Sequence, residues 1–273
     1  MAARDILNYR KGGESMLFSD NSRYSYAVNP LIEVICQLRF PTILSIGSTD
    51  PAQFQEAVRG DFPRYAARQE QQQARITNGR LEQVPPITNY NFISADGFWK
   101  INLTKDFIAL STLRYTRWED FAQKLDKVLA LFIQIYQPPF FERVGLRYIN
   151  AFSRNRLNLQ DALWDDLINS PFIGILSEPD VDETATPRSS LDAEVNLGES
   201  RHMKLHAGPG MLGDGKKDPE PKFILDGDFS VLGDQIPISR IAGDLDVLHD
   251  YAVRLLNAAV TQELHDAMGP TPI

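Results

Sequence analysis

The chain has 273 residues and a mass of 30.8 kDa, with 43% hydrophobic and 23% charged residues, a composition that excludes wholesale disorder. Its 28 Lys and Arg against 36 Asp and Glu give a net charge of −8, which disfavours a protein that coats DNA non-specifically. The single cysteine, Cys36, excludes an internal disulfide and suits a reducing compartment.

We expect a cytoplasmic protein with no membrane-spanning segment. The N-terminal residues contain no apolar segment of the kind found in signal peptides. No stretch approaches the roughly 20 uncharged apolar residues that span a bilayer. The most apolar run, residues 128–136, is typical of a buried helix face.

The first part of the chain predicts a flexible arm, a strand and a helix. Residues 1–28 are polar and contain Gly12-Gly13, so we expect a loosely held N-terminal arm. The pattern from Leu31 predicts a half-buried strand, because apolar side chains alternate with polar ones. The alternating apolar residues are Ile32, Val34, Cys36, Leu38 and Phe40. Asp50 before Pro51 then predicts the N-cap of a helix.

The next part of the chain predicts a strand meander followed by a long helix. Residues 68–89 are rich in Gln and predict an exposed connection. Asp96-Gly97 favours a tight hairpin between strands at 90–94 and 98–103, and a third strand is expected at 107–115. Thr116 and Glu119 have the spacing of a capping box. Apolar residues at helical spacing behind it predict a helix from Trp118 to Tyr136.

The element order then repeats from Phe140 onward. We expect a strand at 140–152, a short helix at 158–169, three further strands and a closing helix at 244–268. The sequence therefore predicts an α+β fold in which two pseudo-repeats of strand, helix, three strands and helix form a curved antiparallel sheet with helices on one face. The first half covers residues 29–139 and the second half 140–273, within one compact unit.

If helices cover the apolar face, the alternate strand positions face outward and basic residues outnumber acidic ones among them. These positions are Glu33, Arg39, Lys100, Asn102, Arg114, Arg143, Arg147, His202, Lys204, His206, Asp226 and Asp228. Arginine offers paired donors that match carboxylate and phosphate oxygens. The candidate residues for binding a protein partner or an anionic small molecule are Glu33, Arg39, Arg143, Arg147 and Lys204. The alternative is a merely solvated sheet face with cross-strand ion pairs, for example Glu33 with Arg147.

Metal and nucleophile chemistry receive less support from the sequence. His202 and His206 on one strand are about 13 Å apart, which is too far for one metal ion, and Asp226 and Asp228 are about 7 Å apart. Cys36 lies on the apolar strand face, where a thiol is usually inert. No nucleophile elbow or phosphate-binding loop of the Walker type occurs, and no cofactor is implied.

Several phrases of the sequence together carry a family resemblance. They are Asn29-Pro30-Leu31-Ile32-Glu33 with Leu38-Arg39-Phe40, then Leu146-Arg147-Tyr148-Ile149-Asn150, and Leu225-Asp226-Gly227-Asp228. The chain resembles a sporadically distributed, functionally uncharacterised family of prokaryotic proteins. Its patchy distribution is similar to that of genes on mobile or defence-associated islands. Gly227 departs from the family pattern, which has an apolar residue between the two aspartates.

Three functions stay open at this point, with the oligomeric state undetermined. The first is a non-catalytic binding or regulatory protein that holds a protein partner or anionic ligand on its arginine-bearing sheet face. The second is a metal-dependent hydrolase or nuclease that uses the region of His202, His206, Asp226 and Asp228. The third is a nucleic-acid-binding saddle, which the net charge of −8 disfavours. Because no catalytic motif occurs, an enzyme is the less favoured class.

Overall fold

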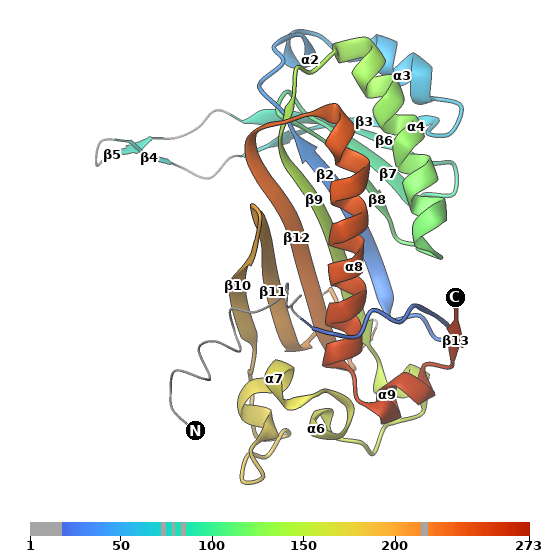
Figure 1. Ribbon diagram of the computed structural model, residues 1–273, viewed down its shortest axis with the longest axis vertical. Helices are drawn as coiled ribbons and strands as arrows, with labels where there is room; N and C mark the ends of the chain where they lie inside the picture. Colours follow the sequence, from blue (N-terminus) through green and yellow to red (C-terminus); the bar gives the residue numbers. More distant parts are fainter. Residues whose placement is uncertain (1–17, 72–74, 78–79, 83–85, 214–217) are drawn as a thin grey trace. The chain divides into compact units, whose positions relative to one another are not determined.

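The computed structural model describes residues 18–71, 75–77, 80–82, 86–213 and 218–273. Its main feature is a nine-stranded antiparallel sheet with the strand order β10-β11-β12-β9-β2-β8-β7-β6-β3, on which helices pack (Figure 1). The predicted α+β class is therefore confirmed. The internal duplication is not confirmed and stays a prediction.

The strands of this sheet are, in chain order, β2 (Leu31–Arg39), β3 (Arg64–Glu70), β6 (Ile87–Ile93), β7 (Trp99–Leu103), β8 (Phe107–Thr112), β9 (Phe141–Phe152), β10 (Leu191–Gly198), β11 (Arg201–Gly210) and β12 (Lys222–Ile236). Two smaller pairs are β1 (Tyr24–Tyr26) with β13 (Pro270–Pro272), and β4 (Arg75–Thr77) with β5 (Arg80–Glu82). The helices are α2 (Ser45–Ser48), α3 (Ala52–Val58), α4 (Trp118–Tyr136), α5 (Arg154–Leu157), α6 (Trp164–Leu167), α7 (Ser170–Ile173), η1 (Gly174–Ser177), η2 (Ile238–Arg240), α8 (Ile241–Ala259) and α9 (Gln262–Ala267).

The chain divides into two compact units that are interleaved along the sequence. Unit 1 comprises Met1–Asn29, Phe152–Gly227 and His249–Ile273, and unit 2 comprises Pro30–Ala151 and Asp228–Leu248. Strands β10, β11 and the first part of β12 belong to unit 1, and the remaining strands of the large sheet lie in unit 2. Among the described residues, no helix is long and apolar enough to cross a membrane.

The core of unit 2 lies between its strands and the helices α3 and α4. On β2 the predicted alternation is confirmed, since Val34, Cys36 and Leu38 are fully buried. Aromatic rings join the strands to the helices: the centroid distances are 5.3 Å for Phe54 of α3 with Phe92 of β6 and 5.7 Å for Trp99 of β7 with Phe121 of α4. These contacts hold the helices against one face of the strands.

In unit 1 the helix α8 holds an N-terminal segment through backbone carbonyl groups. Arg254 Nη1 donates to the carbonyl oxygens of Phe18 (3.1 Å) and Ser19 (2.9 Å), and Asn257 Nδ2 donates to that of Ser22 (2.9 Å). The segment then forms β1, which pairs with β13 near the C-terminus. Residues 1–17 of the predicted arm lie outside the described residues.

Three local predictions are wrong for identifiable reasons. The described residues at 68–89 are mostly strand rather than connection, because β3 is exposed at nearly every position and therefore lacks a period-two pattern. The N-caps of α3 and α4 are Pro51 and Arg117, without a side-chain cap bond, and Thr116 Oγ1 donates instead to Asp120 Oδ2 (3.0 Å). Of the helix expected at 158–169, only α6 at Trp164–Leu167 is helical, because Asn158 adopts a left-handed conformation that ends the preceding helix α5.

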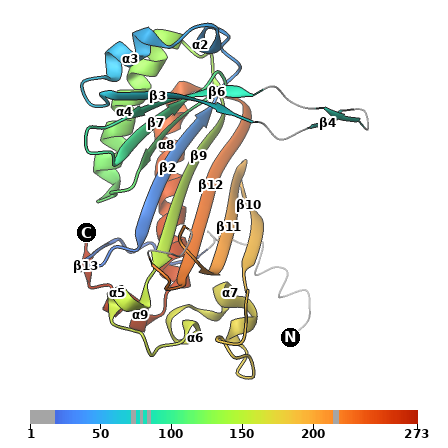
Figure 2. The same cartoon turned by 180° about the vertical axis from the view of Figure 1, so that it is seen from behind.

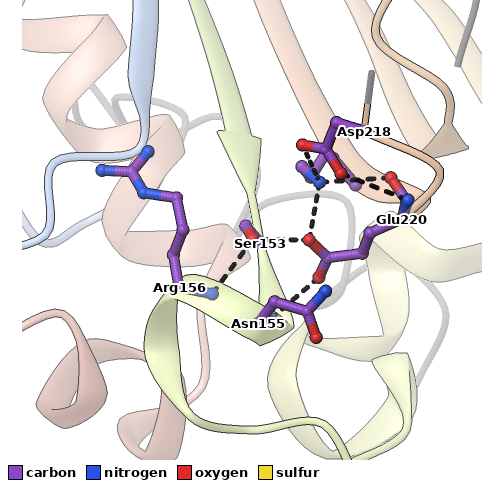
Figure 3. Close-up of polar contacts among 6 residues, drawn as sticks. Ser153, Asn155, Arg156, Asp218 and Glu220 are labelled. Carbon is purple, nitrogen blue, oxygen red and sulfur yellow. Dashed lines mark hydrogen bonds and ion pairs between the residues drawn. The ribbon is translucent and has the colours of Figure 1, made fainter. Parts of the chain in front are cut away.

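A buried ion-pair cluster joins the start of β12 to α5 within unit 1 (Figure 3). Lys222 Nζ lies 2.8 Å from Asp218 Oδ2 and 2.6 Å from Glu220 Oε2, and only 5% of its side chain is exposed. Glu220 also accepts hydrogen bonds from Ser153 Oγ (2.7 Å) and from the backbone N–H of Asn155 (2.8 Å). Burial alone would raise the pKa of Glu220, but the hydrogen bonds from Lys222, Ser153 and Asn155 outweigh it and lower the pKa.

We expect Glu220→Gln to lower the free energy of unfolding by about 2 kcal/mol at neutral pH, because it leaves a buried ammonium with one anionic partner fewer. The pKa of Glu220 is lowered by folding from its ordinary 4.5, so the stabilisation is complete above that pH and is lost as the pH falls through the folded value. Urea unfolding at neutral and acid pH measures both effects. Exposed Glu142→Gln is the control, and a Glu220 effect that is equal at both pH values contradicts this account.

Candidate functional site

The candidate site is the face of the unit 2 strands that none of the described helices of this unit covers, which we call the uncovered face (Figure 2). Residues directly opposite each other on adjacent strands point to the same side of a sheet. Gln37 pairs with Gly145 on one side and Ala109 on the other, and Asn102 pairs with Ala109 and Asn91. We call these five residues the amide row.

Basic residues flank the amide row in both directions along the strands. On one side, Arg39 of β2 pairs with Arg143 of β9 and with Phe107 of β8. On the other side, Lys100 of β7 pairs with Ser111 of β8. The edge strand β3 adds Arg64 and Arg68 to the same face, and both are exposed. The uncovered face therefore has positive charge on both sides of a neutral polar row.

Arg143 is held in one orientation at the end of the amide row. Its Nη2 donates to both carboxylate oxygens of Asp228, at 2.7 and 2.9 Å, and its Nη1 donates to Gln37 Oε1 at 3.3 Å. The guanidinium reaches these partners by lying over Gly145, where an added Cβ would stand 2.0 Å from Nη1. A glycine in the middle of a strand is therefore required for this contact.

The three other predicted site residues in unit 2 differ in their surroundings. Arg39 is exposed and, within the described part of the chain, makes no ion pair. Glu33 lies opposite Ile149. Arg147 is half-buried opposite Ile35, on the uncovered face as predicted. The structure thus brings Arg39 and Arg143 together and leaves Glu33 apart from them.

The side chains of Gln37 and Asn102 have fixed orientations, because Gln37 bonds to Arg143 and Asn102 bonds to Asn89 and Asn91. Asn102 Nδ2 donates to Asn89 Oδ1 (3.1 Å) and Asn91 Oδ1 (2.8 Å), so its own Oδ1 is left as an acceptor. Gln37 accepts from Arg143 through Oε1, so its Nε2 is left as a donor. Among the described residues, neither of these two atoms has a hydrogen-bond partner. A free donor and a free acceptor therefore stand on either side of Ala109.

The acidic character of the chain is not shared evenly between the units. Basic and acidic residues nearly balance in unit 2, so almost all of the net charge of −8 belongs to unit 1. On the uncovered face, Asp228 neutralises Arg143, whereas Arg39, Lys100, Arg64 and Arg68 form no ion pair with any described residue. This face can therefore attract an anion despite the negative charge of the whole protein.

Lys204, the remaining predicted binding residue, lies in unit 1 and already has a partner. The hairpin of β10 and β11 carries three cross-strand polar pairs on one face. Lys204 Nζ lies 2.8 Å from Glu194 Oε1, His206 Nδ1 lies 2.8 Å from Asp192 Oδ1, and His202 Nδ1 lies 2.7 Å from Asn196 Oδ1. These residues form a solvated ladder of the kind expected for an exposed hairpin face.

The residues of the predicted metal alternative do not assemble. Across the part of the chain that the structure describes, no group of three or more His, Cys, Asp or Glu side chains is placed to hold a metal ion. His202 and His206 each face their own partner on β10, and Asp228 binds Arg143. Asp226 is half-buried in the first part of β12. Cys36 is fully buried, and this burial raises the pKa of its thiol, so no reactive thiolate is available.

Comparisons with known proteins add no assignment. No protein-family model matches the chain, and a search of curated proteins finds no match.

We expect Gly145→Ala to displace the Arg143 guanidinium and to break its contact with Asp228. A double-mutant cycle with Arg143→Met and Asp228→Asn, followed by urea unfolding, should give a coupling of about 1–2 kcal/mol in the natural chain and close to zero in the Gly145→Ala background. Gly60→Ala is the control, because an added Cβ there meets nothing within 4 Å. An unchanged coupling energy shows that Arg143 does not depend on Gly145.

The Cys36 thiol should not react with Ellman's reagent in the folded protein and should react fully once the chain is unfolded in urea. The reason is that the side chain has 0% exposure and that burial raises its pKa. Because Cys36 is the single cysteine of the chain, the absorbance change reports this residue alone. Rapid reaction under native conditions contradicts the buried position.

Proposed function

We propose that the protein is a non-catalytic binding protein that holds an anionic group of a partner protein or ligand on the uncovered sheet face of unit 2. The single observation that carries this proposal is the set of basic side chains on that face, Arg39, Lys100, Arg64 and Arg68, that form no ion pair with the described residues. A cytoplasmic location and membership of the resembled prokaryotic family, with its defence association, are further parts of the proposal that rest on the sequence alone.

The arrangement of charge on the face supports binding over mere solvation. A solvated sheet face usually pairs opposite charges across neighbouring strands. Here two arginines, Arg39 and Arg143, are direct cross-strand neighbours, and only Arg143 is neutralised. An anion placed at Arg39 would relieve the repulsion between these like charges. A ligand of this kind therefore supplies the negative partner that Arg39 lacks within the described protein.

The orientation of the polar groups supports recognition of a particular ligand shape. Bonds of Gln37 to Arg143 and of Asn102 to Asn89 and Asn91 fix the directions of the two amide groups before any ligand arrives. Preorganised groups lose little conformational entropy on binding, so modest contacts are enough for specificity. Neither the metal-dependent hydrolase nor the nucleic-acid saddle has a comparable observation in its favour.

The double substitution Arg39→Glu with Lys100→Glu should strongly reduce retention on heparin-agarose, which presents a generic polyanion. The control is Arg59→Glu with Lys127→Glu, which makes the same change of charge at the C-cap of α3 and on α4, where both side chains are exposed. We expect this control to elute close to the natural protein, because Arg59 and Lys127 lie outside the uncovered face and already have carboxylate partners, Glu56 and Asp61. The salt concentration at elution is the measurement. Equal shifts for both variants show that net charge alone governs retention, and the proposal is then wrong.

A further inference from the structure

We propose that the occupant of the uncovered face is an extended acidic segment of a partner protein that lies along β8. This inference rests on the proposed function and adds the chemical class and direction of the ligand. Three observations support it. The first is a row of residues on β8, the second is the pair of free amide atoms of Gln37 and Asn102 on either side of this row, and the third is the basic residues at its two ends.

The floor of the proposed site is a low strip along β8. Its residues on the uncovered face are Phe107, Ala109 and Ser111, and the last two are only 5% exposed. Gln37 of β2 and Asn102 of β7 stand on either side of Ala109. Small residues between longer polar ones allow another backbone to approach closely.

The two free amide atoms match the two polar groups of one peptide bond. In an extended chain the C=O and N–H of one peptide group point to opposite sides. With the chain above Ala109, the C=O accepts a hydrogen bond from Gln37 Nε2 and the N–H donates to Asn102 Oδ1. Both protein atoms are without a partner among the residues described, and their directions are fixed by Arg143 and by Asn89 and Asn91.

Basic side chains lie at both ends of the same strip. Arg39 is level with Phe107 on the β2 side, and Lys100 is level with Ser111 on the β7 side. Four residues along a strand span about 13 Å, which is also the separation of side chains four residues apart in an extended ligand. Two carboxylates at that spacing therefore reach Arg39 and Lys100 while the peptide bond between them lies over Ala109.

The same face is poorly built for single-stranded nucleic acid. Such ligands are held by aromatic side chains on which successive bases stack. Of the strand residues described on this face of unit 2, Phe107 is the only aromatic one, and it is half-buried. Ala109 and Ser111 offer no stacking surface. The observations therefore favour an acidic peptide over a polynucleotide.

The test compares two fluorescent probes of equal length, octaglutamate and oligothymidylate, by fluorescence anisotropy with the full chain at low salt. We expect octaglutamate to bind and oligothymidylate to bind at least tenfold more weakly. Ala109→Leu fills the strip without a change of charge and should weaken octaglutamate binding about tenfold. Ala67→Leu is the matched control, because Ala67 is exposed on the edge strand β3 and pairs with Tyr90, on the opposite face of the sheet.

A third probe tests recognition of the peptide group itself. Backbone N-methylated octaglutamate keeps every carboxylate but lacks the N–H donors, and we expect it to bind about fivefold more weakly than octaglutamate. If Ala109→Leu fails to fold, this probe still tests the strip with the natural protein. Equal affinity for the two peptides shows that charge alone is recognised, and the inference is wrong.

The remaining outcomes separate this inference from the proposed function. Tighter binding of oligothymidylate overturns the acidic peptide but keeps an anion-binding face. Failure of both probes, together with heparin retention that depends on Arg39 and Lys100, overturns the inference alone. Failure of both probes with heparin retention that does not depend on these residues overturns both proposals.

Discussion

A strand buries only every second side chain when helices cover one of its faces, and this constraint governs the candidate site. In unit 2 the covered face takes Val34, Cys36 and Leu38 from β2, each fully buried. Burial of such side chains contributes about 1.5–3 kcal/mol each for the larger ones, so a shift of one residue in register is strongly disfavoured. The same register turns Gln37 and Arg39 to the other face. Packing on the covered face therefore determines which polar residues share the uncovered one.

Gly145 decides how charge is distributed on that uncovered face. Arg39 and Arg143 are cross-strand neighbours, and two extended arginines there would repel each other. Because Gly145 has no side chain, Arg143 folds over it toward Asp228 and Gln37. One arginine is thereby neutralised and oriented, and the other stays exposed with its charge uncompensated. The absence of a side chain at Gly145 thus determines the orientation of Arg143, and it leaves Arg39 as the arginine that is available to a ligand.

The sequence predicts local features well and long-range contacts poorly. The alternation of β2, the long helix α4 and the hairpin at Gly97, where φ is 79°, follow from nearby residues alone. Parity along the strands also places Arg39 and Arg143 on the correct face. The pairing of Arg143 with Asp228 depends on residues 85 positions apart, and no local pattern indicates that β12 lies beside β9. The sequence pattern does not indicate Arg64 and Arg68, because the exposed edge strand β3 carries polar residues on both faces. Asn89 and Asn91 lie on β6, where buried residues at successive positions hide the alternation.

The negative charge of the whole chain makes the proposed site more selective. Charge attraction acts over roughly 10 Å and does not distinguish one polyanion from another, whereas hydrogen bonds act only at contact. In a protein of net charge −8, a few unpaired basic residues attract a polyanion weakly. A ligand that also satisfies Gln37 Nε2 and Asn102 Oδ1 is then retained more strongly than a polyanion that is held by charge alone. Neutral groups between separated positive charges therefore favour a chain that alternates charged side chains with amide groups, which is the chemistry of an acidic peptide.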